Sequence, residues 1–178
     1  MIRFGEEERT RLQASGWVLA DVPPGLTLAR LRAAGLPFKS SKFFDRQSAL
    51  AREVAFSGGD IAYRPGLMPG SLNQPFTACG ELLSRLSPLL HGCVAMCAPA
   101  AVYAWLLSDH HQRTGQWLLQ GCFTWAVDVH VVKEPAEGDL SANHLVVGVF
   151  GTQRPLIVSP LPEGRGAGVG LMPIIVPA

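Results

Sequence analysis

Residues 117–132 read WLLQGCFTWAVDVHVV, residues 144–150 read HLVVGVF, and two shorter apolar runs follow at 156–159 (LIVS) and 169–176 (VGLMPIIV). β-Branched and aromatic residues dominate these runs, while Gly, Pro, Asn and Glu separate them. Runs of this length and composition predict strands joined by short turns, most simply in an antiparallel arrangement. The C-terminal half of the chain is therefore expected to form a sheet.

Helical patterns precede these strands. Helices are predicted at residues 3–15, 28–34, 74–90 and 99–114. The last has the strongest support, because Pro99 suits a first helical turn and Val102 and Leu106 lie on one apolar face. The order of elements predicts an α+β fold, with N-terminal helices packed on a mainly antiparallel sheet formed by the C-terminal half. The expected core includes Trp105, Leu106, Trp125, Val127, Val146, Val147, Ile157 and Ile174.

The composition limits the class of protein. Of 178 residues, 48% are hydrophobic and only 16% are charged, with a formal net charge of +1. A disordered chain needs low hydrophobicity and high net charge, so that class is excluded. The length suits one domain and the charges mark no boundary, so residues 1–178 are predicted to form a single α+β domain. Because few charged side chains are available to cover the surface, we expect a homo-oligomer, most simply a homodimer.

The sequence also limits the partners and the compartment. A near-neutral charge does not favour nucleic-acid binding, although residues 38–46 (FKSSKFFDR) combine aromatic and basic side chains. The longest nearly apolar run, residues 93–107, contains Pro99 and is shorter than the roughly 20 residues of a membrane-spanning helix. The first residues are acidic, unlike a secretion signal, and the four cysteines match no zinc spacing. These features predict a cytoplasmic protein with reduced thiols and no membrane association.

One set of residues has a catalytic pattern. Cys97 stands at the start of the helix predicted at 99–114, where the helix dipole favours a thiolate nucleophile. Such a nucleophile needs a histidine to move its proton, and His144 begins an apolar strand. The pattern resembles papain-like cysteine peptidases, particularly those that process bacteriocins, in which a Cys at a helix start is followed by a His at a strand start and an Asp on the next strand. The resemblance implies Cys97 as nucleophile, His144 as base, and Ser159 in the position of the orienting Asp.

Two other patterns allow a functional and a structural interpretation. Asp128 and His130 lie two residues apart in a predicted strand, so both side chains share a face and could bind a metal ion with a third ligand. A polar strand face is the simpler interpretation. The glycine-rich residues 164–170 precede a strand instead of the helix that a phosphate loop requires, which favours a hairpin turn. The sequence therefore predicts no bound metal and no cofactor.

The incomplete catalytic and metal patterns favour a non-catalytic binding or self-assembly module. The alternative is a papain-like cysteine hydrolase or transferase that uses Cys97 and His144. Whether the protein is an enzyme is left open, and the sequence identifies no ligand or substrate.

Overall fold

The computed structural model describes residues 2–39, 56–133, 140–150, 156–162 and 166–178. Within these ranges the chain forms helices α1 (Glu6–Ala14), α2 (Leu28–Ala33), α5 (Cys79–Ser84) and α6 (Ala100–Thr114), with short 3-10 helices η1 (Phe76–Ala78) and η2 (Ser87–Leu89). The strands are β1 (Val18–Val22), β2 (Gly59–Tyr63), β3 (Cys93–Met96), β4 (Phe123–Lys133), β5 (Leu140–Val149), β6 (Leu156–Pro162), β7 (Val169–Gly170) and β8 (Ile174–Pro177). The described ranges contain no helix with the length and apolar character needed to cross a bilayer.

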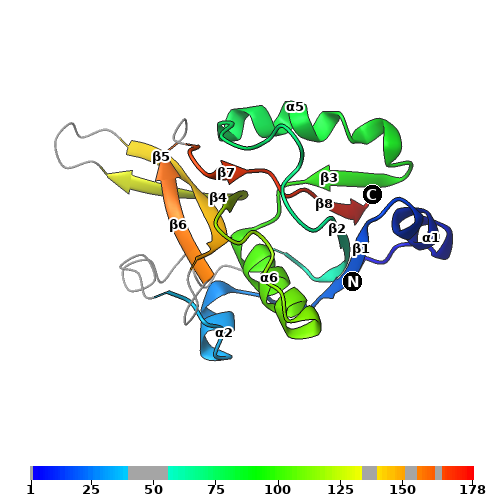
Figure 1. The fold of residues 1–178 in the computed structure, drawn as a ribbon, viewed down its shortest axis with the longest axis horizontal. Coiled ribbons are helices and arrows are strands. Elements are labelled where there is room, and N and C mark those ends of the chain that lie inside the picture. The colour runs from blue at the N-terminus through cyan, green and yellow to red at the C-terminus, as the bar shows by residue number, and fades with distance from the viewer. Residues whose placement is uncertain (1, 40–55, 134–139, 151–155, 163–165) are drawn as a thin grey trace.

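The strands form two four-stranded sheets (Figure 1). One has the order β1-β2-β8-β3 and the other β6-β5-β4-β7. All pairings are antiparallel except the short parallel contact between β4 and β7. The α+β prediction is confirmed, but the expected single sheet is divided. The last strand, β8, joins β2 and β3 in a sheet with the N-terminal strands.

Successive side chains of β5 belong alternately to two core clusters, one on each face of the second sheet. Leu145, Val147 and Val149 belong to the core cluster that contains most of α6. Val146 faces the opposite way and packs with Trp125 in a second cluster, which includes residues of α5. Successive side chains of a strand point to opposite faces, which explains this division. The second sheet is therefore buried on both faces at residues 145–149 of β5.

Helix α6 confirms the prediction at 99–114. Its residues from Ala100 to Ala104 are all buried, as are Leu106 and Leu107. The helix ends at Gly115, whose φ of 73° is the left-handed conformation that glycine adopts without a Cβ clash. The predicted helix at 74–90 is wrong in length, because η1, α5 and η2 are separate short elements. Pro88 lies in the first turn of η2 and cannot donate the backbone hydrogen bond that a continuous helix would need.

A local irregularity in β4 removes Val127 from the core. Between Trp125 and Val129 the register with β5 shifts, since these residues pair with Val146 and His144 respectively. The extra residues leave Val127 44% exposed, so its assignment to the core is wrong. The other expected core residues are buried or half-buried.

The glycine-rich segment 164–170 is not a hairpin turn. β7 pairs in parallel with β4, and both β5 and β4 separate it from β6 in the sheet order. A hairpin would require β6 and β7 to be antiparallel neighbours. Residues 163–165 of this segment lie outside the described ranges.

The aromatic and basic segment 38–46 is described only at its first two residues. Phe38 is buried and Lys39 is exposed, whereas residues 40–46 lie outside the described ranges.

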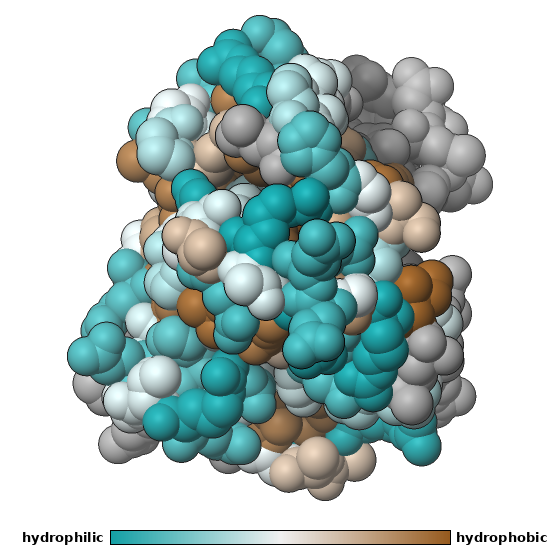
Figure 2. Space-filling view, turned by 90° about the vertical axis from the view of Figure 1, so that its right-hand side faces the viewer, coloured by the Kyte–Doolittle hydropathy of each residue, from teal (hydrophilic) through white to brown (hydrophobic). Residues whose placement is uncertain are grey.

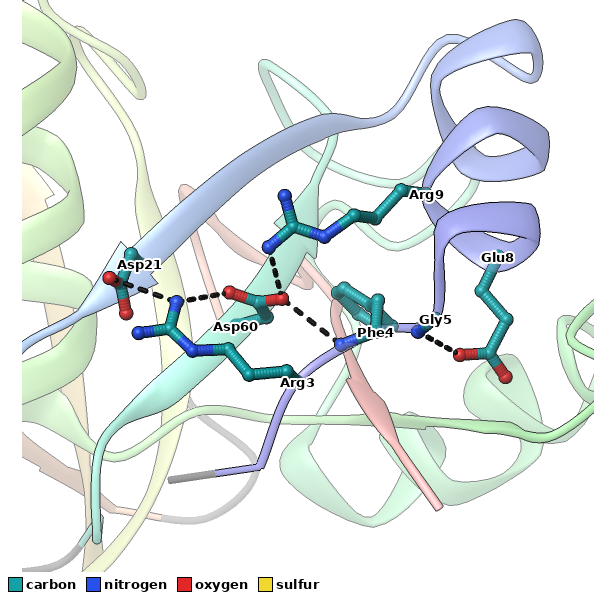
Figure 3. Close-up of polar contacts among 7 residues, drawn as sticks. All are labelled: Arg3, Phe4, Gly5, Glu8, Arg9, Asp21 and Asp60. Atoms are coloured by element: carbon teal, nitrogen blue, oxygen red, sulfur yellow. Dashed lines mark hydrogen bonds and ion pairs between the residues drawn. The ribbon is translucent and has the colours of Figure 1, made fainter.

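A buried carboxylate attaches the N-terminal segment to the first sheet (Figure 3). Asp60 on β2 is 4% exposed and accepts hydrogen bonds from Arg3 at 2.7 Å, Arg9 at 2.6 Å and the Phe4 backbone N–H at 3.0 Å. Arg3 also lies 2.9 Å from Asp21 of β1. Burial by itself raises the pKa of Asp60, but these donors outweigh it and hold the pKa below its usual value.

Candidate functional site

An open groove of about 530 Å³ lies beside α5 and β3, which are neighbours in Figure 1. Its walls come from four parts of the chain that are far apart in sequence. The lining residues are Phe76, Thr77, Cys79, Gly80, Leu83, Ala95, Met96, Cys97, Val127 and His144. Most of these side chains are apolar, with two thiols and one imidazole among them. A concave, mainly apolar site with a few polar groups is the usual form of a small-molecule site.

The segment that carries Cys97 is held by hydrogen bonds on both sides. β3 ends at Met96, and Cys97 stands three residues before the first residue of α6. The hydroxyl of the buried Tyr103 accepts from the Ala98 N–H at 3.0 Å and donates to the Met172 carbonyl at 2.6 Å. The Ala98 carbonyl accepts from the Val127 N–H at 3.2 Å. This linker is therefore hydrogen-bonded to α6 and to β4, and through Tyr103 to the segment that precedes β8.

Cys97 forms a thiol pair with Cys79. Both are buried in the second core cluster, and a hydrogen bond joins the two thiols. This hydrogen bond, together with burial, raises the pKa of Cys97. The same hydrogen bond lowers the pKa of Cys79, although burial acts in the opposite direction. The partner thiol and burial therefore both oppose the thiolate that a helix dipole would favour at Cys97.

His144 reaches the same groove from β5. Its imidazole stacks on the ring of Phe76, with centroids 3.5 Å apart and planes inclined by 19°. Trp125 approaches the imidazole edge-on at a centroid distance of 6.5 Å. The structure thus brings the predicted nucleophile, Cys97, and the predicted base to one groove, with an aromatic ring covering a face of the base.

Ser159 lies on β6, the strand that pairs with the His144 strand β5. In the register of β5 with β6, Ser159 lies opposite Val146, whereas His144 lies opposite Leu161. Residues diagonal to each other on neighbouring strands are separated by about 7–8 Å. The Ser159 hydroxyl forms a long, 3.4 Å contact with the carbonyl of Pro160. Leu161 is therefore the residue directly opposite His144, and Ser159 lies diagonally across from it.

Asp128 caps the first turn of α6. Its carboxylate accepts a hydrogen bond from the Ala100 N–H at 2.5 Å, which the shifted register of β4 makes possible. Pro99, the residue at the N-cap, has no side-chain group to satisfy this donor. Among the described residues, no three His, Cys, Asp or Glu side chains form a metal-binding group. The side chain of His130 lies outside those that the structure describes, so the predicted Asp128–His130 pair stays a prediction.

Sequence reasoning missed Cys79 and Phe76. Both lie in the segment predicted as a long helix, where Cys79 has the pattern of an ordinary apolar residue. Neither carries a local signal that points to Cys97 or His144, because their contacts depend on how η1 and α5 pack on β3 and β5.

Comparisons with known proteins provide no assignment for the groove. Protein families, curated proteins and solved structures were compared with the chain, and none of them matches it. The function is therefore inferred from the chemistry of the groove.

Proposed function

We propose that this chain is a non-catalytic binding module whose groove takes a small, mainly apolar molecule with an aromatic ring. The observation that carries this proposal is the groove of about 530 Å³, within the roughly 300–1,000 Å³ usual for small-molecule sites. Phe76, Leu83 and Met96 supply apolar and polarisable surface. The stacked rings of Phe76 and His144 offer an aromatic wall, against which a ligand ring can pack edge-on or offset.

The state of the thiols supports binding over catalysis. Cys97 is 6% exposed, and its hydrogen bond to Cys79 and its burial both favour the protonated thiol. A thiol that keeps its proton is a weak nucleophile. Phe76 also covers one face of the His144 imidazole. These groups suit the floor of a binding site better than a nucleophile and its base.

Fluorescence of 1-anilinonaphthalene-8-sulfonate, an aromatic probe of apolar sites, tests the proposal. We expect saturable binding to the folded chain, weakened about tenfold by Val127→Trp, which places a large ring in the groove. Val94→Trp is the matched control, because Val94 is similarly exposed, on β3, and does not line the groove. Equal binding by wild type and Val127→Trp would remove the groove as the site.

We also propose that the module is a homodimer in the cytoplasm. Val127 and Val129 on β4 are 44% and 41% exposed, and β7 pairs with β4 only at Phe123 and Thr124 among the described residues. An exposed apolar strand edge is a ready site for self-association. The face on the side of α1 is mostly hydrophilic, with hydrophobic surface in small separate areas (Figure 2), which favours β4 as the contact. All four cysteines are free thiols, as a reducing compartment requires.

Light scattering coupled to size-exclusion chromatography measures the oligomeric state. A dimer that becomes monomeric in Val129→Lys, but not in Val94→Lys, is the expected result. A monomeric wild type, or loss of the dimer in the Val94 variant alone, would contradict a contact through β4.

The second candidate is a papain-like cysteine hydrolase or transferase. The observation in its favour is that Cys97 and His144 line one groove. In this candidate Cys97 is the nucleophile, His144 the base, and Ser159 the residue in the orienting position. It requires rapid alkylation of Cys97 by iodoacetamide in the native protein, slowed by His144→Ala. The binding module predicts slow alkylation of Cys97 in both proteins.

A further inference from the structure

We propose that Cys79 and Cys97 are a redox-active thiol pair, which a hydroperoxide converts to a disulfide at the floor of the groove. This inference does not depend on which molecule the groove binds or on whether the protein is a hydrolase. It assigns an oxidation site and the class of its oxidant.

Two segments distant in sequence bring the sulfurs together. Cys79 is the first residue of α5, and Cys97 belongs to the linker between β3 and α6. Their hydrogen bond places the two thiols in direct contact, within one core cluster. Both residues line the groove, so a molecule as small as hydrogen peroxide can reach them although each is less than a tenth exposed.

The remaining cysteines lie in different surroundings. Cys93 packs against a third cluster, around Trp17 and Leu90, and Cys122 packs against the cluster that contains most of α6. Neither lines the groove. The chain thus contains one thiol pair that is poised for a disulfide and two cysteines that serve as internal controls.

The oxidation takes two steps. The thiolate of one cysteine of the pair attacks one peroxide oxygen, the O–O bond breaks, and the leaving hydroxide takes a proton to form water, which leaves that cysteine as a sulfenic acid. The sulfur of the other cysteine then attacks this sulfur. The S–O bond breaks, and the hydroxyl leaves with the proton of the second thiol as a second water. In total, two thiols and one hydrogen peroxide give one disulfide and two waters.

The disulfide would connect α5 to the β3–α6 linker. A cross-link between segments that are already in contact restricts the unfolded chain more than the folded one. We therefore expect the oxidised protein to unfold at a higher temperature, by about 5 °C or more for a chain of this size. Reduction by dithiothreitol should return the unfolding temperature to its starting value.

Hydrogen peroxide is the probe, applied to the full native chain and followed by intact mass and peptide mapping. The expected product has lost two hydrogen atoms and contains a Cys79–Cys97 cross-link. Cys93→Ser and Cys122→Ser should form it at the wild-type rate, whereas Cys79→Ser and Cys97→Ser should not form it. Circular dichroism of each serine variant confirms that it is folded.

Dimedone, which traps sulfenic acids, tests the intermediate. In Cys97→Ser and in Cys79→Ser the remaining cysteine of the pair cannot form the cross-link, so peroxide should leave there a sulfenic acid that dimedone labels. A cross-link that forms only in urea, or one that includes Cys93 or Cys122, would overturn the proposal. So would the absence of any cross-link in the native chain.

Discussion

The environment of the Asp60 carboxylate predicts how a single substitution changes the stability of the fold. This carboxylate is buried under three donors, and two of them are guanidinium groups that are themselves 43% exposed. Replacing it by asparagine removes the charge that Arg3 and Arg9 face. We expect Asp60→Asn to lower the free energy of unfolding in urea by about 1–3 kcal/mol, since hydrogen bonds to charged groups are stronger than neutral ones. Asp21→Asn is the control, because Asp21 is 56% exposed and exposed ion pairs contribute at most about 1 kcal/mol.

The same carboxylate predicts a pH dependence. The folded-state pKa of Asp60 is lowered, so its contribution is fully present above the unfolded-state pKa of about 3.9 and is lost as the pH falls through the folded value. As the pH falls below about 4, the free energy of unfolding should therefore decrease more in the wild type than in Asp60→Asn. Urea unfolding at a series of pH values measures this difference. Parallel curves for the two proteins would contradict the assignment.

Tyr103 provides a second prediction at single-residue level. Its fully buried hydroxyl joins the Ala98 N–H to the Met172 carbonyl, and so connects the Cys97 linker to the segment that precedes β8. Tyr103→Phe leaves both backbone groups buried without this partner, which should cost about 1–3 kcal/mol of unfolding free energy. The linker should also loosen, so we expect faster alkylation of Cys97 in this variant. Wild-type stability together with wild-type alkylation would show that the hydroxyl does not hold the linker.

At the level of elements, the start of α6 depends on β4. Asp128 caps Ala100 across a tertiary contact, so its loss should destabilise the helix as loss of an N-cap does. Asp128→Ala should lower the unfolding free energy by about 1 kcal/mol, whereas Asp128→Asn should lower it less, because an amide oxygen also accepts from the N–H. Thermal unfolding followed by circular dichroism measures both. An equal loss in the two variants would indicate that the charge matters and the cap does not.

The elements differ in how far the sequence could predict them. Local sequence was sufficient for two elements. The apolar pattern of residues 99–114 predicted the helix α6, and the apolar run at 144–149 predicted the strand β5. Within the register shift of β4 between Trp125 and Val129, the Val127 N–H donates to the Ala98 carbonyl, a tertiary contact that no local sequence pattern indicates. The same shift explains why Val127 is exposed and why Asp128 reaches α6. Tertiary contacts here outweigh local propensity.

At the level of the whole molecule, the two ends of the chain complete one sheet. β8 pairs with both β2 and β3, so without β8 the first sheet lacks one of its two inner strands, the one that joins β3 to β2. Removal of residues 173–178 should therefore prevent cooperative unfolding, because Ile174 and Ile175 are fully buried in separate core clusters. Truncation after Val176, which retains these two, is the matched control. Cooperative thermal unfolding of the shorter chain would contradict this role of β8.

The candidate site also belongs to the whole molecule. Cys97 and His144 were predicted as a pair from a pattern of residue types, and the fold brings both to one groove. Cys79 and Phe76 could not be predicted, because they reach the groove only when α5 packs beside β3. The acidity of Cys97 depends on Cys79, and Phe76 covers one face of His144, so the surroundings of both predicted residues include a residue that the pattern omits.

Nuclear magnetic resonance of the methionine methyl groups tests the binding proposal most directly. Met96 lines the groove and Met172 is fully buried elsewhere, so one isotope label reports on the site and on a control position in the same sample. Titration with 1-anilinonaphthalene-8-sulfonate should shift the Met96 signal in a saturable manner and leave the Met172 signal in place. A Met96 signal that does not move while the probe binds would show that the groove is not the binding site.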